Sequence, residues 1–209
     1  VLTTDQHPKT VCVQCELSGQ LVTLTGFAKG SGMIHPKMAT MLGFVTTDAQ
    51  IDGPVLQDML STNVDQTFNQ ITVDGDTSTN DMVVTLANGL ADNPSLQVGT
   101  TDYDIFNQAL HYVLGQLAKQ IAADGEGATK LVECNVVHAA TTFDGQQIAK
   151  AIVGSNLVKA AIFGEDPNWG RIISTIGATD ADIDVATVDI EMNGVLLVQQ
   201  SLAVDFDMA

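Results

Sequence analysis

Apolar and polar positions alternate near the start of the chain in a way that predicts a β-hairpin. The runs VCVQCEL (11–17) and LVTLTGF (21–27) are rich in β-branched residues, and the short link SGQ between them suits a tight turn. The run at 39–49, which follows a glycine-rich segment, predicts a further strand that is largely buried. We therefore expect an antiparallel sheet in this part of the chain.

Helical spacing dominates the middle of the chain. A helix is predicted from the proline-containing stretch 52–54, because apolar residues then recur at helical spacing as far as Phe68. A second helix is predicted from about Ser78 to Asn88, and a third from about Tyr103 to Ala123.

The last third of the chain mixes both kinds of pattern. Strands are predicted at 130–140 and 157–164, helices at 144–155 and 168–178, and a hairpin at 185–200 that turns at Asn193-Gly194. Hairpins mixed with helices predict an α/β protein with a mainly antiparallel sheet, because the βαβ alternation of a doubly wound parallel fold is not sustained. No repeat or linker divides the sequence, so we expect a single region over 1–209.

Composition and charge narrow the classes of function. The 209 residues are 45% hydrophobic, yet no apolar run approaches the ~18 residues that a membrane span requires. Acidic residues outnumber basic ones by 25 to 8, and the net charge of -17 disfavours binding to a phosphate backbone. We expect neither a membrane nor a nucleic acid as partner. The chain starts at Val1 without a secretory leader, and we expect the true N-terminus to lie upstream.

The cysteines, the histidines and the single arginine predict structural roles. Cys12 and Cys15 form a C-x-x-C pattern, but a strand places them on opposite faces, which favours core packing over a redox or metal site. Cys134 leaves the count odd, and the four histidines lack ligand spacing, so no metal site is expected. Arg171 is expected to pair with a neighbouring carboxylate and to fix the turn at 163–172.

Thr40 follows a segment with unusual backbone freedom. Gly30 and Gly32 permit positive φ and close approach, so the chain can bend sharply before a buried strand. A hydroxyl placed against the carbonyl carbon of Ala39 can attack it, shift the acyl group from nitrogen to oxygen, and leave an ester that water cuts. Thr40 would then carry both a nucleophilic oxygen and an α-amine that can act as base. A mid-chain threonine is, however, more often an ordinary strand residue.

Two other loops carry candidate binding groups. The stretch 73–81 holds three aspartates among hydroxyl residues, which is typical of redundant helix capping, although such a loop can also hold an anionic substrate group. Glu126 lies between Gly125 and Gly127, where a carboxylate can meet a substrate ammonium, or can simply be a solvated loop acid.

Five segments together resemble the family of ornithine acetyltransferases, also called glutamate N-acetyltransferases. These segments are TTDQHPK, AKGSGMIHPKMATMLGFVTTDA, DGDTSTND, DGEGATK and LVKAAIFGEDPNWGRI, which occur in this order. The resemblance implies a layered α/β sandwich like that of self-processing N-terminal-nucleophile enzymes, with its own topology.

The resemblance also implies an activity and a set of site residues. A precursor would cut itself between Ala39 and Thr40, and its alpha chain (ending at 39) and beta chain (40–209 here) would stay associated as a heterotetramer. The enzyme would move acetyl from N-acetylornithine to glutamate in a cytoplasmic or mitochondrial-matrix step of arginine synthesis. It would need no cofactor, although some members accept acetyl-CoA as donor. Thr40 matches the nucleophile, and Thr3, Lys29, Thr40 and Glu126 match substrate-binding positions.

Two features of the resembled family have no counterpart in this sequence. The family's oxyanion-stabilising threonine and glycine belong to a more N-terminal region, and an asparagine and a threonine that bind substrate belong to its C-terminal tail. The chain by itself is therefore expected to be a weak catalyst or none, because one lost oxyanion donor typically raises the barrier by about 2.7 to 4 kcal/mol. Two alternatives stay open: a non-catalytic amino-acid-binding or scaffold piece, and a self-processed aminopeptidase or amidase with water as acceptor.

Overall fold

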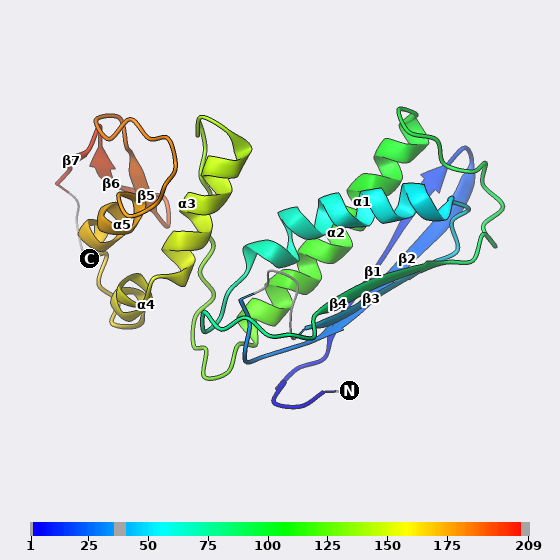
Figure 1. The fold of residues 1–209 in the computed structure, drawn as a ribbon, viewed down its shortest axis with the longest axis horizontal. Helices are drawn as coiled ribbons and strands as arrows, with labels where there is room; N and C mark the ends of the chain where they lie inside the picture. The colour runs from blue at the N-terminus through cyan, green and yellow to red at the C-terminus, as the bar shows by residue number, and fades with distance from the viewer. Residues whose placement is uncertain (1, 36–40, 206–209) are drawn as a thin grey trace. The chain divides into compact units, whose positions relative to one another are not determined.

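The computed structural model describes residues 2–35 and 41–205 of the chain. It divides into two compact units, Val1–Leu131 and Val132–Ala209, each of which has its own sheet and its own helices (Figure 1). The expected self-cleavage between residues 39 and 40, which would divide the chain into two processed chains, stays a prediction.

The first unit is built on a four-stranded sheet in the order β1-β2-β3-β4. Its strands are β1 (Lys9–Leu17), β2 (Gln20–Lys29), β3 (Leu42–Thr47) and β4 (Met82–Ala87). The β1–β2 and β2–β3 pairs are antiparallel and the β3–β4 pair is parallel. The predicted hairpin is confirmed, and it turns through Ser18 and Gly19, whose φ angles are 50° and 82°.

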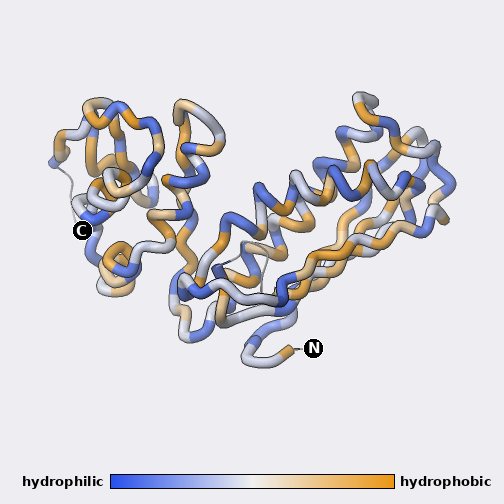
Figure 2. Tube along the Cα trace, in the orientation of Figure 1, coloured by the Kyte–Doolittle hydropathy of each residue, from blue (hydrophilic) through white to orange (hydrophobic). Residues whose placement is uncertain are grey.

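Two helices lie on the same face of this sheet (Figure 1). They are α1 (Gly53–Gln66), which continues into the short 3₁₀ helix η1 (Phe68–Gln70), and α2 (Thr101–Ala123). Both predicted helices are confirmed. The side chains of Phe106, Leu110, Leu114 and Leu117 on α2 are fully buried between helix and sheet. Figure 2 shows the resulting alternation of polar and apolar residues along both helices.

The prediction of a helix ending at Asn88 is wrong, because residues 82–87 form β4 instead. This segment contains Val83, Val84 and Thr85, whose branched side chains favour the extended backbone. The strand pairs along its whole length with β3. Hydrogen bonds to a neighbouring strand therefore outweigh the weak helical spacing of three apolar residues.

The second unit combines three helices with a small antiparallel sheet in the order β5-β6-β7. The helices are α3 (Thr142–Gly154), α4 (Asn156–Phe163) and α5 (Trp169–Ile176), and the strands are β5 (Ile190–Met192), β6 (Val195–Gln199) and β7 (Leu202–Ala203). The predicted turn is confirmed at Asn193 and Gly194, with φ angles of 52° and 84°. Isoleucines of α3 and α5 and residues of β6 form its core.

Two predicted strands in this part of the chain are wrong. Residues 157–163 lie in α4 and Gly164 is its C-cap, because Ser155 caps the start of the helix by accepting from the amide of Val158, and the run LVKAAIF is rich in helix formers. Residues 131–137 alternate in exposure as a strand does, and Cys134 and Val136 pack on the core. They pair with no other strand in the described part of the chain, so no sheet forms there.

The α/β class with a mainly antiparallel sheet is confirmed. Cys12 is exposed, whereas Cys15, on the opposite face of β1, packs against the core, so the packing role holds for Cys15 alone of this pair. Arg171 does fix its turn, but Nη1 donates to the carbonyl oxygen of Leu157 at 2.7 Å where a carboxylate was expected.

Within the described residues, no helix has the length and apolar character of a membrane span, and no group of three potential ligands is placed to hold a metal ion.

Candidate active site

The glycine-rich segment after β2 is the centre of the candidate site. Gly30 has a φ of 150°, and a Cβ there would come 3.1 Å from Cδ1 of Ile34. Gly32 matters for a different reason, because a Cβ at this position would come 2.6 Å from Oε2 of Glu126 and would displace that carboxylate. The predicted bend and the predicted close approach are both present, and the group that approaches is the candidate binding carboxylate.

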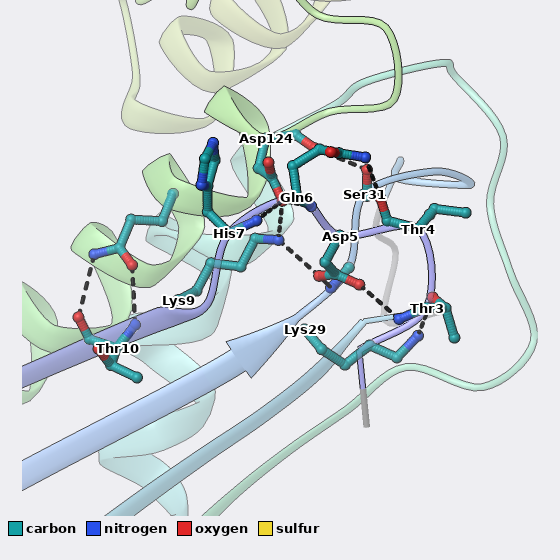
Figure 3. A network of polar contacts seen from close by, with 12 residues as sticks. Thr3, Thr4, Asp5, Gln6, His7, Lys9, Thr10, Lys29, Ser31 and Asp124 are labelled. Carbon is teal, nitrogen blue, oxygen red and sulfur yellow. Dashed lines mark hydrogen bonds and ion pairs between the residues drawn. The ribbon is translucent and has the colours of Figure 1, made fainter.

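Three predicted binding residues gather around residues 29–32. Nζ of Lys29 donates to Oγ1 of Thr3 at 3.4 Å, which joins the end of β2 to the N-terminal segment (Figure 3). The amide of Glu126 donates to the carbonyl oxygen of Ser31 at 2.9 Å, and this holds the exposed Glu126 beside Gly32. The site therefore brings together an ammonium, a hydroxyl and a carboxylate from three segments of the chain around residues 29–32.

Thr40 and Ala39, the predicted nucleophile and cleavage site, lie outside the described residues, so these two assignments remain predictions. The next residue, Met41, is fully buried. Its amide donates to Oδ1 of Asp81, and its carbonyl oxygen accepts from the amide of Met82 at 3.0 Å. The backbone that follows the predicted nucleophile is thus fixed to the start of β4.

The loop at 73–81 does not cap a helix, contrary to the interpretation from sequence. Asp74 accepts instead from the amides of Met33 at 2.5 Å and Ile34 at 3.0 Å. The amide of Val73 donates to the carbonyl oxygen of Ile34 at 2.7 Å. The loop therefore stabilises the segment that follows Gly32, and its aspartate satisfies backbone donors of another part of the chain.

Asp81 has an unusual electrostatic environment. Its Oδ2 atom is buried and has no hydrogen-bond partner in the described part of the chain. Burial raises the pKa of Asp81 to about 6, although the hydrogen bond from the Met41 amide lowers it. Desolvation of this kind favours the protonated form of a carboxyl group.

We expect Asp81→Asn to stabilise the folded protein at about pH 8 and to have little effect at about pH 4. The pKa of Asp81 rises from 3.8 to about 6 on folding, so the protonated carboxyl group stabilises the folded state. This contribution is complete below pH 3.8 and is lost as the pH rises through about 6. Asparagine keeps an oxygen for the Met41 amide and carries no charge. The gain is about 1 kcal/mol after a discount for the partial exposure of Asp81. Urea-unfolding midpoints at both pH values measure it, and equal shifts at the two would contradict it.

Sequence reasoning missed the charged network beside this site. Nζ of Lys9 lies 2.6 Å from Oδ1 of Asp5 and 2.5 Å from Oδ2 of Asp124, which is the C-cap residue of α2 (Figure 3). Oδ2 of Asp124 also accepts from the amides of Gln6 and His7, at 2.9 and 3.3 Å. Burial opposes ionisation of both carboxyl groups, but the hydrogen bonds from Lys9 and from backbone amides hold the pKa values of Asp5 and Asp124 below their usual range.

One signal in the sequence points to Lys9. The inward-facing positions of β1 follow a period of two from Leu17 back through Cys15, Val13 and Val11, and the same period places Lys9 on the buried face. A buried lysine requires an anionic partner. Its partner Asp124 is 115 positions away in the sequence, and no local pattern identifies it.

Comparisons with known proteins agree on one family. The model of the ArgJ family matches residues 1–209. The chain is 53% identical over 207 residues to the arginine biosynthesis bifunctional protein ArgJ of Streptococcus thermophilus, covering 99% of this chain and 52% of that protein. It is 53% identical over 209 residues to the protein of the same name from Symbiobacterium thermophilum, covering 100% of this chain and 52% of that protein.

A solved structure gives the same result. The crystal structure of arginine biosynthesis bifunctional protein ArgJ from Bacillus halodurans matches with a TM-score of 0.79 and 52% identity, covering 80% of this chain and 79% of that chain. The chain spans about half the length of the curated relatives it matches.

Proposed function

Because the chain belongs to the ArgJ family, we propose that its parent protein is a glutamate N-acetyltransferase that moves acetyl from N-acetylornithine to glutamate. The observation that carries this proposal is the gathering of Thr3, Lys29 and Glu126 around the glycine-rich segment ahead of Thr40. An ammonium and a carboxylate held around the same glycine-rich segment suit a substrate that itself carries a carboxylate and an ammonium.

Self-cleavage generates the nucleophile. Oγ1 of Thr40 attacks the carbonyl carbon of Ala39, the C–N bond of that amide breaks, and the nitrogen takes up the hydroxyl proton. Water then hydrolyses the ester, which leaves a carboxylate on Ala39 and a free α-amine on Thr40. This amine has an ordinary pKa near 8, so it can accept a proton at neutral pH. The chain is thereby divided into the segment 1–39 and the segment 40–209.

Acetyl transfer proceeds in two half-reactions. The Thr40 amine takes the proton of the Thr40 hydroxyl as Oγ1 attacks the acetyl carbonyl carbon of N-acetylornithine. The C–N bond then breaks, and ornithine leaves after its nitrogen receives that proton from the Thr40 ammonium. The acetyl ester on Thr40 is then attacked by the α-amine of glutamate, which gives N-acetylglutamate and restores the hydroxyl. A covalent intermediate of this kind divides one difficult step into two easier ones.

Charge pairing positions the donor. Lys29 meets the α-carboxylate of N-acetylornithine, with the Thr3 hydroxyl beside it, and Glu126 meets the side-chain ammonium. The oxyanion donors belong to a more N-terminal part of the parent protein.

We further propose that the two processed chains associate as a heterotetramer in the cytoplasm, or in the mitochondrial matrix of a eukaryote. The enzyme needs no cofactor, and acetyl-CoA serves as a second possible donor substrate.

The test is an assay of the full-length parent protein with N-acetylornithine and glutamate. We expect ornithine and N-acetylglutamate in equal amounts, and parallel double-reciprocal plots as the second substrate is varied. Replacing N-acetylornithine by acetyl-CoA tests the second donor. If ornithine is released equally fast without glutamate, together with acetate, the protein is an amidase. If neither product forms and the chain stays uncut, the protein is a binding or scaffold protein.

A further inference from the structure

Lys9 is a buried cation held between two carboxylates at the edge of the candidate site. Its side chain is 1% exposed, and its ammonium contacts Asp5 and Asp124 at 2.6 and 2.5 Å (Figure 3). Removing three charges from water is costly, and an apolar replacement of such a buried group is often neutral or stabilising. Fold stability alone is therefore a weak reason for this arrangement, and its position beside the site suggests another.

The two carboxylates also fix the backbone of three separate segments. Asp5 accepts from the amide of Gly30 at 2.8 Å and from the amide of Thr3 at 3.1 Å. Asp124 accepts from two amides of the N-terminal segment. The network thereby joins the start of the chain, the end of β2 and the end of α2.

Three of the proposed binding residues, Thr3, Lys29 and Glu126, are connected to this network. Thr3 donates its own amide to Asp5, and Lys29 precedes Gly30, whose amide does the same. Glu126 is connected through Ser31: the Ser31 hydroxyl donates to the carbonyl oxygen of Asp124 at 2.8 Å, and the Ser31 carbonyl oxygen accepts from the amide of Glu126. A displacement of Asp5 relative to Asp124 therefore changes the separation between Lys29 and Glu126.

We propose that Lys9 is a positioning residue: by holding Asp5 against Asp124, it fixes the distance between Lys29 and Glu126 and so selects the chain length of the amino-acid donor. This inference rests on the proposed function, in which these two residues bind the carboxylate and the ammonium of N-acetylornithine. A donor that is one methylene longer leaves one of its charges poorly paired. Lys9 itself touches no substrate.

The experiment compares two donors in the full-length parent protein. Nα-Acetyllysine is one methylene longer than N-acetylornithine, and one methylene is typically worth about 10- to 200-fold in discrimination. The test variant is Lys9→Met with Asp5→Asn and Asp124→Asn, which removes all three charges and keeps oxygens for the backbone amides. Lys9→Met alone would leave two unpaired carboxylates and could prevent folding.

We expect the triple variant to stay folded and to be cleaved, while its ratio of kcat/KM for N-acetylornithine over Nα-acetyllysine falls about tenfold or more. Most of the change should lie in KM, because the groups that react are untouched. Lys119→Met, which removes an exposed lysine from α2, is the matched control and should keep the parent's ratio.

Three results would overturn the inference. The first is a triple variant that keeps the parent's ratio of kcat/KM for the two donors. Equal losses of kcat/KM with both donors give this result too, and they indicate a merely structural role. The second is a triple variant that does not fold, because the network would then carry stability and not spacing. The third is a parent protein that transfers no acetyl, which overturns the proposed function and this inference together.

Discussion

Thr40→Ala in the full-length parent protein should leave a single uncut chain and lower the rate of acetyl transfer by about 10,000-fold or more. The alanine side chain has no oxygen to attack the Ala39 carbonyl carbon, so neither the ester nor the free α-amine can form. Without the amine the protein also lacks its proposed base. Intact mass measures cleavage, because the two fragments of the parent sum to the precursor plus one water. Ornithine release measures transfer.

Two further variants make this result specific. Thr46→Ala removes an exposed hydroxyl on β3 that donates to the carbonyl oxygen of Thr25 at 3.4 Å, and it should be cut and active like the parent. Thr40→Ser keeps a hydroxyl and should retain both reactions at a reduced rate. Two fragments from Thr40→Ala, or transfer at the parent's rate by the uncut alanine variant, would refute the assignment of Thr40.

Elements whose determinants are local were predictable from the sequence. The long helix α2 has apolar residues at helical spacing along its 23 residues. The side chain of its N-cap residue Thr100 accepts from the amide of Tyr103 at 3.3 Å. The hairpin turns at Ser18-Gly19 and Asn193-Gly194 contain residues that tolerate positive φ. In each case neighbours in sequence supply most of the interactions that decide the structure.

Short apolar segments could not be assigned in the same way. Residues 82–87 and 157–163 are short and mostly apolar, so their patterns fit both periodicities. The first becomes a strand because β3 offers a complete row of partners, and the second becomes a helix because Ser155 caps it. The presence of a partner strand is a property of the whole unit, so a local pattern does not contain it.

The residues of the candidate site also differ in whether the local sequence or a contact between distant segments identifies them. Glu126 was identified because it lies between two glycines, and both Glu126 and Lys29 lie in motifs that resemble those of a known family. Lys9 and Asp124 were not, although both lie inside quoted motifs, since their roles come from a contact across 115 positions. The residues proposed to bind substrate carry a sequence signature, whereas those proposed to hold them in place are identified from the packed structure.

Glu126→Gln should lower kcat/KM for N-acetylornithine by about 100-fold, with a smaller effect on cleavage of the precursor. Glutamine keeps the shape of the side chain but removes the charge that meets the donor ammonium in the proposed site. Loss of one partner from a charge pair that the bound donor buries costs about 2 to 5 kcal/mol. The measurement is the initial rate of ornithine release at several donor concentrations, made on enzyme whose complete processing has been verified by intact mass.

Gly32→Ala tests the same carboxylate through its packing. The added Cβ would come 2.6 Å from Oε2 of Glu126, so the carboxylate must move, and we expect a loss of kcat/KM of about tenfold in the same direction. Gly53→Ala is the matched control, because a Cβ at this position in the first turn of α1 meets nothing within 4 Å. Glu16→Gln, on the exposed face of β1, controls for loss of charge. If Glu126→Gln and Gly32→Ala both keep the parent's kcat/KM for N-acetylornithine, Glu126 does not bind the donor, and the ammonium must be met elsewhere in the parent protein.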